Sequence, residues 1–212
     1  MTSQRLQVER IGSGDDRFAD AKRWEYEIFG RQNHFTSATD DEAGEMCQYR
    51  RWEACSEFYA GFADPAPGAA PVAILRALRW NPELGMDSFS TVADARVFQC
   101  EDGLQNMLYP HWAEFFTESP PSSFAELATQ AVSKPHRYSG VMAQVWEAFF
   151  AELAADGVRY VTVALVVPLF DFYRALIGEA ITQIGRVLPD YVGADSVPAL
   201  VDLSRLVPVS KP

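Results

Sequence analysis

The sequence feature that most constrains the fold is a strand–loop–helix–strand pattern in the second half of the chain. Residues 124–133 are apolar enough for a buried strand, and apolar side chains recur at helical spacing over 141–153. Gly157 marks the end of that helix, and the β-branched run 160–167 predicts a second strand that is buried on both faces. Two strands joined by such a helix form a right-handed βαβ unit, so we expect them to be parallel.

The rest of the chain predicts further strands and helices around this unit. Residues 6–11, the second half of 52–62, and 72–80 predict strands; 17–31, a short stretch within 107–116, and 169–178 predict helices; and 64–68 predicts a turn. The acidic stretch 36–44 is most simply a mobile loop, although Asp40 and Asp41 could instead face a substrate amine.

Composition limits the classes of function. At 212 residues the chain fits one domain, 1–212, and its net charge of −11 argues against nucleic-acid binding. The longest apolar run, 160–170, is too short to cross a bilayer, and the N-terminus lacks the apolar core of a secretion signal. We therefore expect a cytoplasmic protein without a membrane partner. Three unpatterned cysteines and three distant histidines predict no metal site.

Several motifs give the chain a resemblance to the Gcn5-related N-acetyltransferase (GNAT) superfamily. Arg137–Gly140 is similar to its Arg-x-x-Gly turn before a helix, and 172–178 to its aromatic-Tyr-x-x-x-Gly helix. The runs 184–203 and 25–35 resemble more narrowly the acyl-homoserine-lactone (autoinducer) synthases and N-acyl amino acid synthases. The resemblance implies an α+β, three-layer α/β/α fold, with a mixed, mostly antiparallel sheet and a central splayed pair of parallel strands.

The resemblance also implies how an acyl donor would bind. The pantetheine arm would pair with the end of the first parallel strand, and the turn after it would hold phosphate. The residues implied are Val132, Ser133, Lys134, Arg137, Ser139 and Gly140. Met142 occupies the last small position of the phosphate loop, where bulk obstructs a pyrophosphate. An acyl carrier protein would therefore be tolerated better than coenzyme A, with Lys134, His136 and Arg137 as its docking patch. Either donor would be a substrate rather than a tightly bound cofactor. The alternative to a docking patch at Lys134, His136 and Arg137 is a solvated loop.

The implied catalytic residues are Glu126, as the base, and Tyr173, as the acid that protonates the leaving thiolate. The apolar neighbours of Glu126 predict a raised pKa. Tyr173 could equally be a core aromatic residue.

Four further residues are implied to bind substrate: Phe29, Phe35, Arg76 and Trp112. Arg76 could instead be an ordinary strand residue. Trp112 could belong to a helix that only covers the core.

Departures from the autoinducer-synthase pattern bear on the substrate. Glu25 and Thr129 stand where that branch has arginines, and Phe35 stands where it has tryptophan. These differences argue against homoserine-lactone production. They favour acyl transfer to the amine of another small molecule. Two alternatives remain: hydrolysis or cyclisation of a thioester in the same fold, and a protein that binds a ligand or partner without catalysis.

Overall fold

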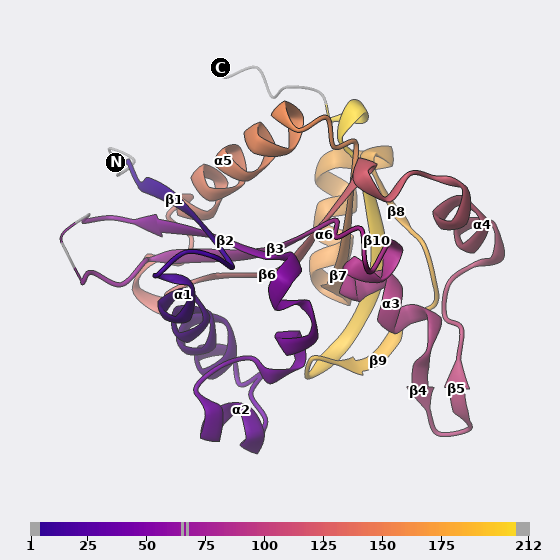
Figure 1. The fold of residues 1–212 in the computed structure, drawn as a ribbon, viewed down its shortest axis with the longest axis horizontal. Helices are drawn as coiled ribbons and strands as arrows, with labels where there is room; N and C mark the ends of the chain where they lie inside the picture. The colour runs from indigo at the N-terminus through magenta and orange to yellow at the C-terminus, as the bar shows by residue number, and fades with distance from the viewer. Residues whose placement is uncertain (1–4, 65, 67, 207–212) are drawn as a thin grey trace. The chain divides into compact units, whose positions relative to one another are not determined.

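The computed structural model describes residues 5–64, 66 and 68–206 (Figure 1). Their contacts divide the chain into two compact units. Unit 1 comprises Met1–Arg79 and Leu127–Asp156, and unit 2 comprises Trp80–Glu126 and Gly157–Pro212. The boundary falls within one strand, β6. The prediction of a single domain stays a prediction.

The regular elements follow the order predicted from the sequence, with additions in the middle of the chain and, as β8, β9 and β10, toward its C-terminal end. The strands are β1 Gln7–Gly12, β2 Ser56–Phe62, β3 Ala73–Arg79, β4 Phe98–Cys100, β5 Gly103–Gln105, β6 Phe124–Val132, β7 Tyr160–Val166, β8 Ile181–Gln183, β9 Leu188–Tyr191 and β10 Ala194–Asp202. The α-helices are α1 Phe18–Glu25, α2 Ala38–Ala43, α3 Ser90–Arg96, α4 Pro110–Glu118, α5 Val141–Ala155 and α6 Val167–Ile177. A π-helix spans Tyr26–Arg31, and 3₁₀ turns span Cys47–Cys55, Met86–Ser88, Pro121–Ser123, Lys134–His136, Gly178–Ala180 and Leu203–Arg205.

The main sheet is mixed and mostly antiparallel, as predicted. Its strand order is β1-β2-β3-β6-β7-β10-β8, with β9 paired to β10. Strands β1, β2 and β3 are antiparallel neighbours, and so are β7, β10 and β8. The predicted parallel pair is β6 and β7.

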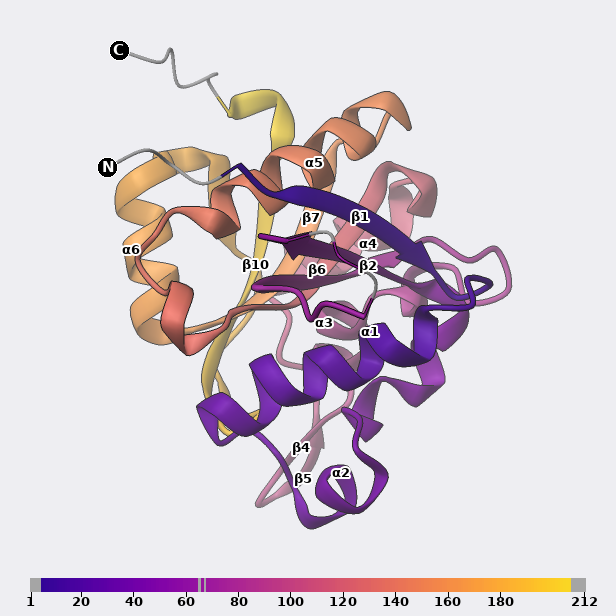
Figure 2. The same cartoon turned by 90° about the vertical axis from the view of Figure 1, so that its left-hand side faces the viewer.

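In unit 1 a helix covers each face of the sheet, so that the unit has three layers (Figure 2). Helix α1 packs its apolar stripe on β2 and β3, where Phe18 and Phe58 have ring centroids 5.5 Å apart. Helix α5 covers the other face with Val145 and Phe149, both fully buried. Burial of these stripes removes apolar surface from water, which is the main force that holds the layers together.

Unit 2 is built on β7 and β10, which pair from Tyr160 to Val166. Helices α3 and α6 both contact this strand pair. The ring of Phe124, at the start of β6, lies in a cluster of aromatic side chains that includes Phe115 and Tyr160. None of the helices in the described part of the chain combines the length and apolar composition that a bilayer crossing requires.

Two sequence predictions in unit 1 need correction. The stretch predicted as a mobile loop, 36–44, contains α2, because Ser37 and Asp40 form a reciprocal capping box. Burial alone would raise the pKa of the Asp40 carboxyl, but hydrogen bonds from Ser37 and Cys47 lower it below its usual value. The helix predicted over 17–31 becomes a π-helix at Tyr26–Arg31, a form that periodicity does not reveal.

Close backbone packing in unit 2 predicts a strong effect of one methyl group. A Cβ at Gly185 would lie 2.5 Å from the carbonyl oxygen of Met107, and backbone cannot move aside as a side chain can. We expect Gly185→Ala to lower the free energy of unfolding by about 1–3 kcal/mol, measured by urea denaturation. Gly12→Ala is the control, because a Cβ there meets nothing within 4 Å. Equal urea midpoints for the two variants would contradict this packing.

Candidate functional site

The predicted donor loop lies in unit 1, between the end of β6 and the start of α5. Gly140 precedes α5 with φ +78°, a conformation that favours glycine, so this position depends on the absence of a side chain. The hydroxyl of Ser133 is hydrogen-bonded to Nδ1 of His136 at 3.0 Å, and that of Ser139 donates to the His136 carbonyl. The loop is therefore ordered by its own side chains, while Lys134 is exposed.

Two of the groups predicted to contact the acyl donor, the Ser133 N–H and the Arg137 side chain, already have hydrogen-bond partners within the protein. The Ser133 N–H donates to the Val72 carbonyl at 2.9 Å, which removes it as a donor to an oxyanion. The Arg137 guanidinium donates to Asn33 Oδ1 at 2.8 Å and to the Val132 carbonyl at 3.4 Å. Arg137 is thus held in place at the loop, only partly exposed.

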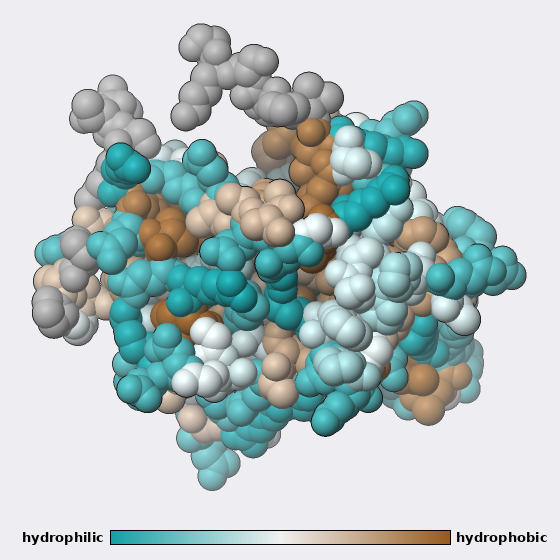
Figure 3. Space-filling model, turned by 45° about the horizontal axis from the view of Figure 1, so that its top comes forward, coloured by the Kyte–Doolittle hydropathy of each residue, from teal (hydrophilic) through white to brown (hydrophobic). Residues whose placement is uncertain are grey.

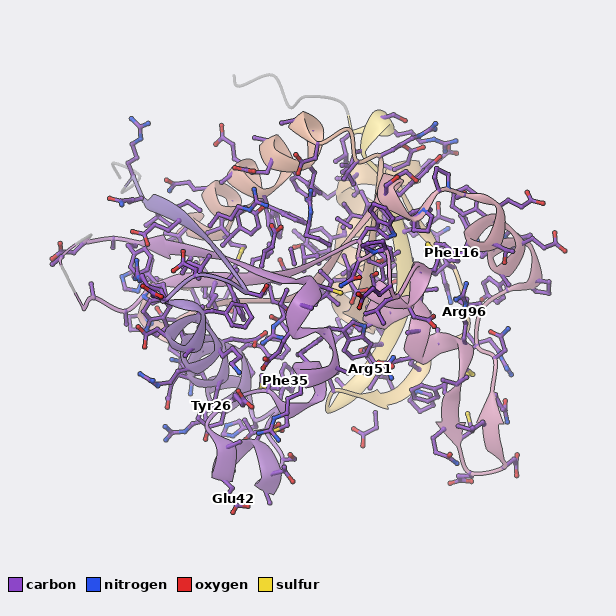
Figure 4. The ribbon with its side chains drawn as sticks, in the orientation of Figure 1. Tyr26, Phe35, Glu42, Arg51, Arg96 and Phe116 are labelled. Atoms are coloured by element: carbon purple, nitrogen blue, oxygen red, sulfur yellow. The ribbon has the colours of Figure 1, made fainter. Side chains whose placement is uncertain are left out.

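Hydrogen bonds join the donor loop to the segment after the π-helix. Besides the Arg137–Asn33 contact, the Lys134 N–H donates to Gln32 Oε1 at 2.9 Å. Gln32 lies between Phe29 and Phe35, whose ring centroids are 5.3 Å apart. Figure 4 labels Phe35, together with Tyr26 at the start of the π-helix. The segment that carries two predicted substrate-binding residues thus contacts the predicted donor loop through Gln32 and Asn33, two amide side chains that the sequence did not single out.

Arg76 lies in the interior of unit 1, with 1% of its side chain exposed. Its guanidinium binds the Glu25 carboxylate through Nε and Nη2, at 3.0 and 2.6 Å. Thr129 also donates to Glu25. The guanidinium lies 4.6 Å from the ring centroid of Tyr49. Arg76 therefore positions α1, β3 and β6 of unit 1, and any effect on substrate would act through them.

Glu126 lies in unit 2 with its side chain fully buried. Its carboxylate accepts hydrogen bonds from the Ser90 hydroxyl, from the Thr91 N–H at 3.0 Å, and from the Thr162 hydroxyl at 3.3 Å. Ser90 and Thr91 are the first residues of α3, where backbone N–H groups lack partners inside the helix. Glu126 therefore fastens α3 to β6.

Burial raises the pKa of Glu126 to about 7, against the hydrogen bonds from Ser90, Thr91 and Thr162, which favour the ionised form. The charge of Asp94 acts in the same direction as burial. A carboxyl group with such a pKa can change its protonation state near neutral pH. The direction agrees with the expectation from the apolar neighbours of Glu126.

Tyr173 and Trp112 also belong to unit 2, on separate helices. Tyr173 lies on α6, partly exposed, with its ring centroid 5.5 Å from that of Phe172. Trp112 lies on α4 and lines a cavity of about 420 Å³. Their predicted roles stay predictions. Among the described residues, no group of three or more His, Cys, Asp and Glu side chains is arranged to hold a metal ion.

The buried pair of Glu25 and Arg76 predicts strong coupling between the two residues. Glu25→Gln and Arg76→Met should each lower the free energy of unfolding by about 3–5 kcal/mol, because each leaves a buried charge without its partner. The double variant should lose clearly less than the sum. The exposed pair of Glu27 and Arg31, on the surface of the π-helix, is the control and should show little coupling. Additive effects at Glu25 and Arg76 would contradict the pairing.

The raised pKa of Glu126 predicts a specific pH dependence of stability. An acid whose pKa is raised on folding contributes stability that is fully present below its unfolded pKa, 4.5, and is lost as the pH rises through its folded pKa, about 7. The shift corresponds to about 3 kcal/mol. Between pH 4.5 and 8, the free energy of unfolding of the wild-type protein should therefore fall by about 3 kcal/mol relative to that of Glu126→Gln, measured by urea denaturation. Glu118→Gln, at an exposed position, should follow wild type, and a pH-independent difference for Glu126→Gln would contradict the shift.

A scan against protein-family models and a search of the curated proteins find no match to the chain. Solved structures do match. The N-acyl amino acid synthase FeeM, from uncultured soil microbes, matches with a TM-score of 0.59 and 12% identity, over 94% of this chain and 92% of that chain. The coenzyme A-dependent acyl-homoserine lactone synthase BjaI matches with a TM-score of 0.57 and 16% identity, over 94% and 84%.

A third match is described as histone acetyltransferase HPA2 and related acetyltransferase from Corynebacterium glutamicum. Its TM-score is 0.53 at 13% identity, over 97% of this chain and 99% of that chain. At such identities the likeness establishes the fold and leaves the reaction open. The order of strands, the parallel pair and these neighbours together show that the chain has the fold of the Gcn5-related N-acetyltransferases.

Proposed function

We propose that this protein is an N-acyltransferase that moves an acyl group from a thioester to the amine of a small molecule. The observation that carries the proposal is the donor loop, 133–140, which is ordered by its own hydrogen bonds between β6 and α5 of this fold. The structural similarity to FeeM, an N-acyl amino acid synthase, and to BjaI, an acyl-homoserine lactone synthase, supports acyl transfer to small amines.

In the proposed reaction the amine nitrogen attacks the thioester carbonyl carbon, the C–S bond breaks, and the amine proton and the leaving thiolate must both be handled. Glu126 is the proposed acceptor of the amine proton. Because its carboxyl group is fully buried, the proton would reach it through the hydroxyl of Ser90 or Thr162. A pKa near 7 suits this role, since the group is partly ionised at neutral pH. Tyr173 is the proposed donor to the thiolate.

The proposed donor is an acyl carrier protein rather than coenzyme A. Lys134 is exposed on the donor loop, next to His136 and to the fully exposed Tyr138, so that a basic and aromatic surface is available. Met142 follows Gly140 by two residues, where bulk disfavours a pyrophosphate. Acyl carrier proteins are acidic, so a local positive charge must overcome the net charge of −11 of this chain.

The full burial of Glu126 favours a second candidate, a protein that binds an acyl thioester without turning it over. A carboxyl group that only fastens α3 to β6 needs no access to substrate. The two candidates differ in whether thioester is consumed.

Thioester consumption and product mass test the proposal. We incubate the protein with acyl-carrier-protein and acyl-coenzyme A panels and an extract as the amine source, and expect a new N-acyl product by mass spectrometry. Glu126→Gln and Tyr173→Phe should each lower kcat by about 100-fold or more while donor binding persists. Lys134→Ser should raise KM for the carrier-protein donor alone.

Exposed Arg23→Gln is the matched control for charge and should behave as wild type. Binding of a donor with no consumption by the wild-type protein would favour the second candidate. Unchanged kcat in Glu126→Gln would remove Glu126 from the mechanism.

A further inference from the structure

The cavity of about 420 Å³ in unit 2 lies at the start of β7. Its walls come from α4, from Tyr160 at the beginning of β7, from the end of β10, and from the 3₁₀ turns Gly178–Ala180 and Leu203–Arg205. The volume falls within the range of small-molecule sites. Leu200, on β10, closes the floor and is 4% exposed.

One wall of the cavity is a continuous run of aromatic rings. The rings of Trp112 and Phe115 lie edge to face, with centroids 5.2 Å apart, and those of Phe115 and Tyr160 do the same at 5.3 Å. All three side chains are partly exposed, so their remaining surface faces the cavity. A wall of this kind favours a planar aromatic ring over an aliphatic group of equal size.

The rim of the cavity carries both signs of charge. Arg159 and Asp202 form an ion pair at 3.1 Å, which largely neutralises both. Arg205 approaches Asp202 through Nε at 3.6 Å, and its side chain is 59% exposed, so part of its guanidinium faces solvent. Glu179 is exposed, and in the described part of the chain no ion pair joins it to Arg205, although their turns are neighbours. Arg205, a cation with only a long ion pair, and Glu179, an exposed anion, thus stand beside the aromatic wall.

We propose that this cavity binds a free aromatic amino acid. The ring packs against Trp112, Phe115 and Tyr160, the carboxylate binds Arg205, and the ammonium binds Glu179. A guanidinium pairs a carboxylate with directional hydrogen bonds, and a carboxylate pairs an ammonium as a point charge. A ligand with only one of the two charges leaves one rim residue unused.

The proposal does not depend on the proposed acyl transfer. Tyr160 is the first residue of β7, whereas α6 and Tyr173 follow the last, so about 20 Å of strand separates them within unit 2. Tyr160 also stacks on Phe124, with centroids 5.1 Å apart, and Phe124 lies two residues before Glu126. A ligand against Tyr160 would thus rest on the aromatic cluster that includes Phe124.

Isothermal titration calorimetry on the full chain with four probes tests the site. They are L-phenylalanine, 3-phenylpropionate, which lacks the ammonium, phenethylamine, which lacks the carboxylate, and L-cyclohexylalanine, which lacks the aromatic ring. We expect one-to-one binding of phenylalanine with a Kd between about 10 μM and 1 mM, and weaker binding of each of the other three.

Crossed variants assign each charge. Arg205→Gln should weaken phenylalanine and phenylpropionate by about three- to tenfold and leave phenethylamine unchanged. Glu179→Gln should weaken phenylalanine and phenethylamine by a similar factor and leave phenylpropionate unchanged. Arg174→Gln and Glu101→Gln, the same substitutions at exposed positions outside the cavity, should change nothing.

This pattern would support the proposal. Absence of saturable phenylalanine binding would overturn it, as would equal effects of both rim variants on all probes. Cyclohexylalanine binding as tightly as phenylalanine would also overturn it, and would favour an aliphatic ligand such as an acyl chain.

Discussion

The attachment of α3 to β6 depends on the removal of one carboxyl group, that of Glu126, from water. An ionised carboxylate in an apolar interior is costly unless hydrogen bonds compensate for lost hydration. Here Thr91 supplies a backbone N–H at the start of α3, and Ser90 and Thr162 supply hydroxyls. The compensation is incomplete, so the pKa rises to about 7 instead of remaining at its usual 4.5. The same contacts fix α3 against β6, so position and acidity have one origin.

Strand β6 carries a second buried polar residue, Thr129, three residues after Glu126 and so on the other face of the strand. There Glu25 accepts from both Thr129 and Arg76. Glu25 and Thr129 are two of the three positions at which the sequence departs from the autoinducer-synthase pattern. The structure brings these departures together in one network, in which Glu25 and Arg76 satisfy each other.

A structural feature could be predicted from the sequence where its signal is local, and could not where its signal depends on distant residues. Periodicity over 124–167 fixed the central βαβ unit, since local patterns determine helix and strand there. The π-helix at Tyr26–Arg31 was not predicted, because its pattern of apolar residues differs little from that of an α-helix. Helix α3 and the hairpin of β4 and β5 are short, and aromatic residues around them obscured their limits. Figure 3 shows a face of the molecule whose side chains are mainly hydrophilic, interrupted by smaller hydrophobic patches.

Site residues were harder to assign, because their partners are distant in the sequence. Arg76 finds Glu25 51 residues away, and Glu126 finds Ser90 36 residues away, so no local motif distinguishes a buried ion pair from a substrate contact. The Ser-Thr pair at 90–91, followed by an apolar run, is a sequence signal of a helix start.

A measurement of the pKa of Glu126 tests this account most directly. Carbon-detected NMR titration of the side-chain carboxyl, assigned by comparison with Glu126→Gln, measures its pKa without reference to activity or unfolding. We predict an apparent pKa near 7, with the signal changing little between pH 4 and 5. A midpoint at the usual value of about 4.5 would mean that water or unconsidered donors solvate the group, and would contradict the account.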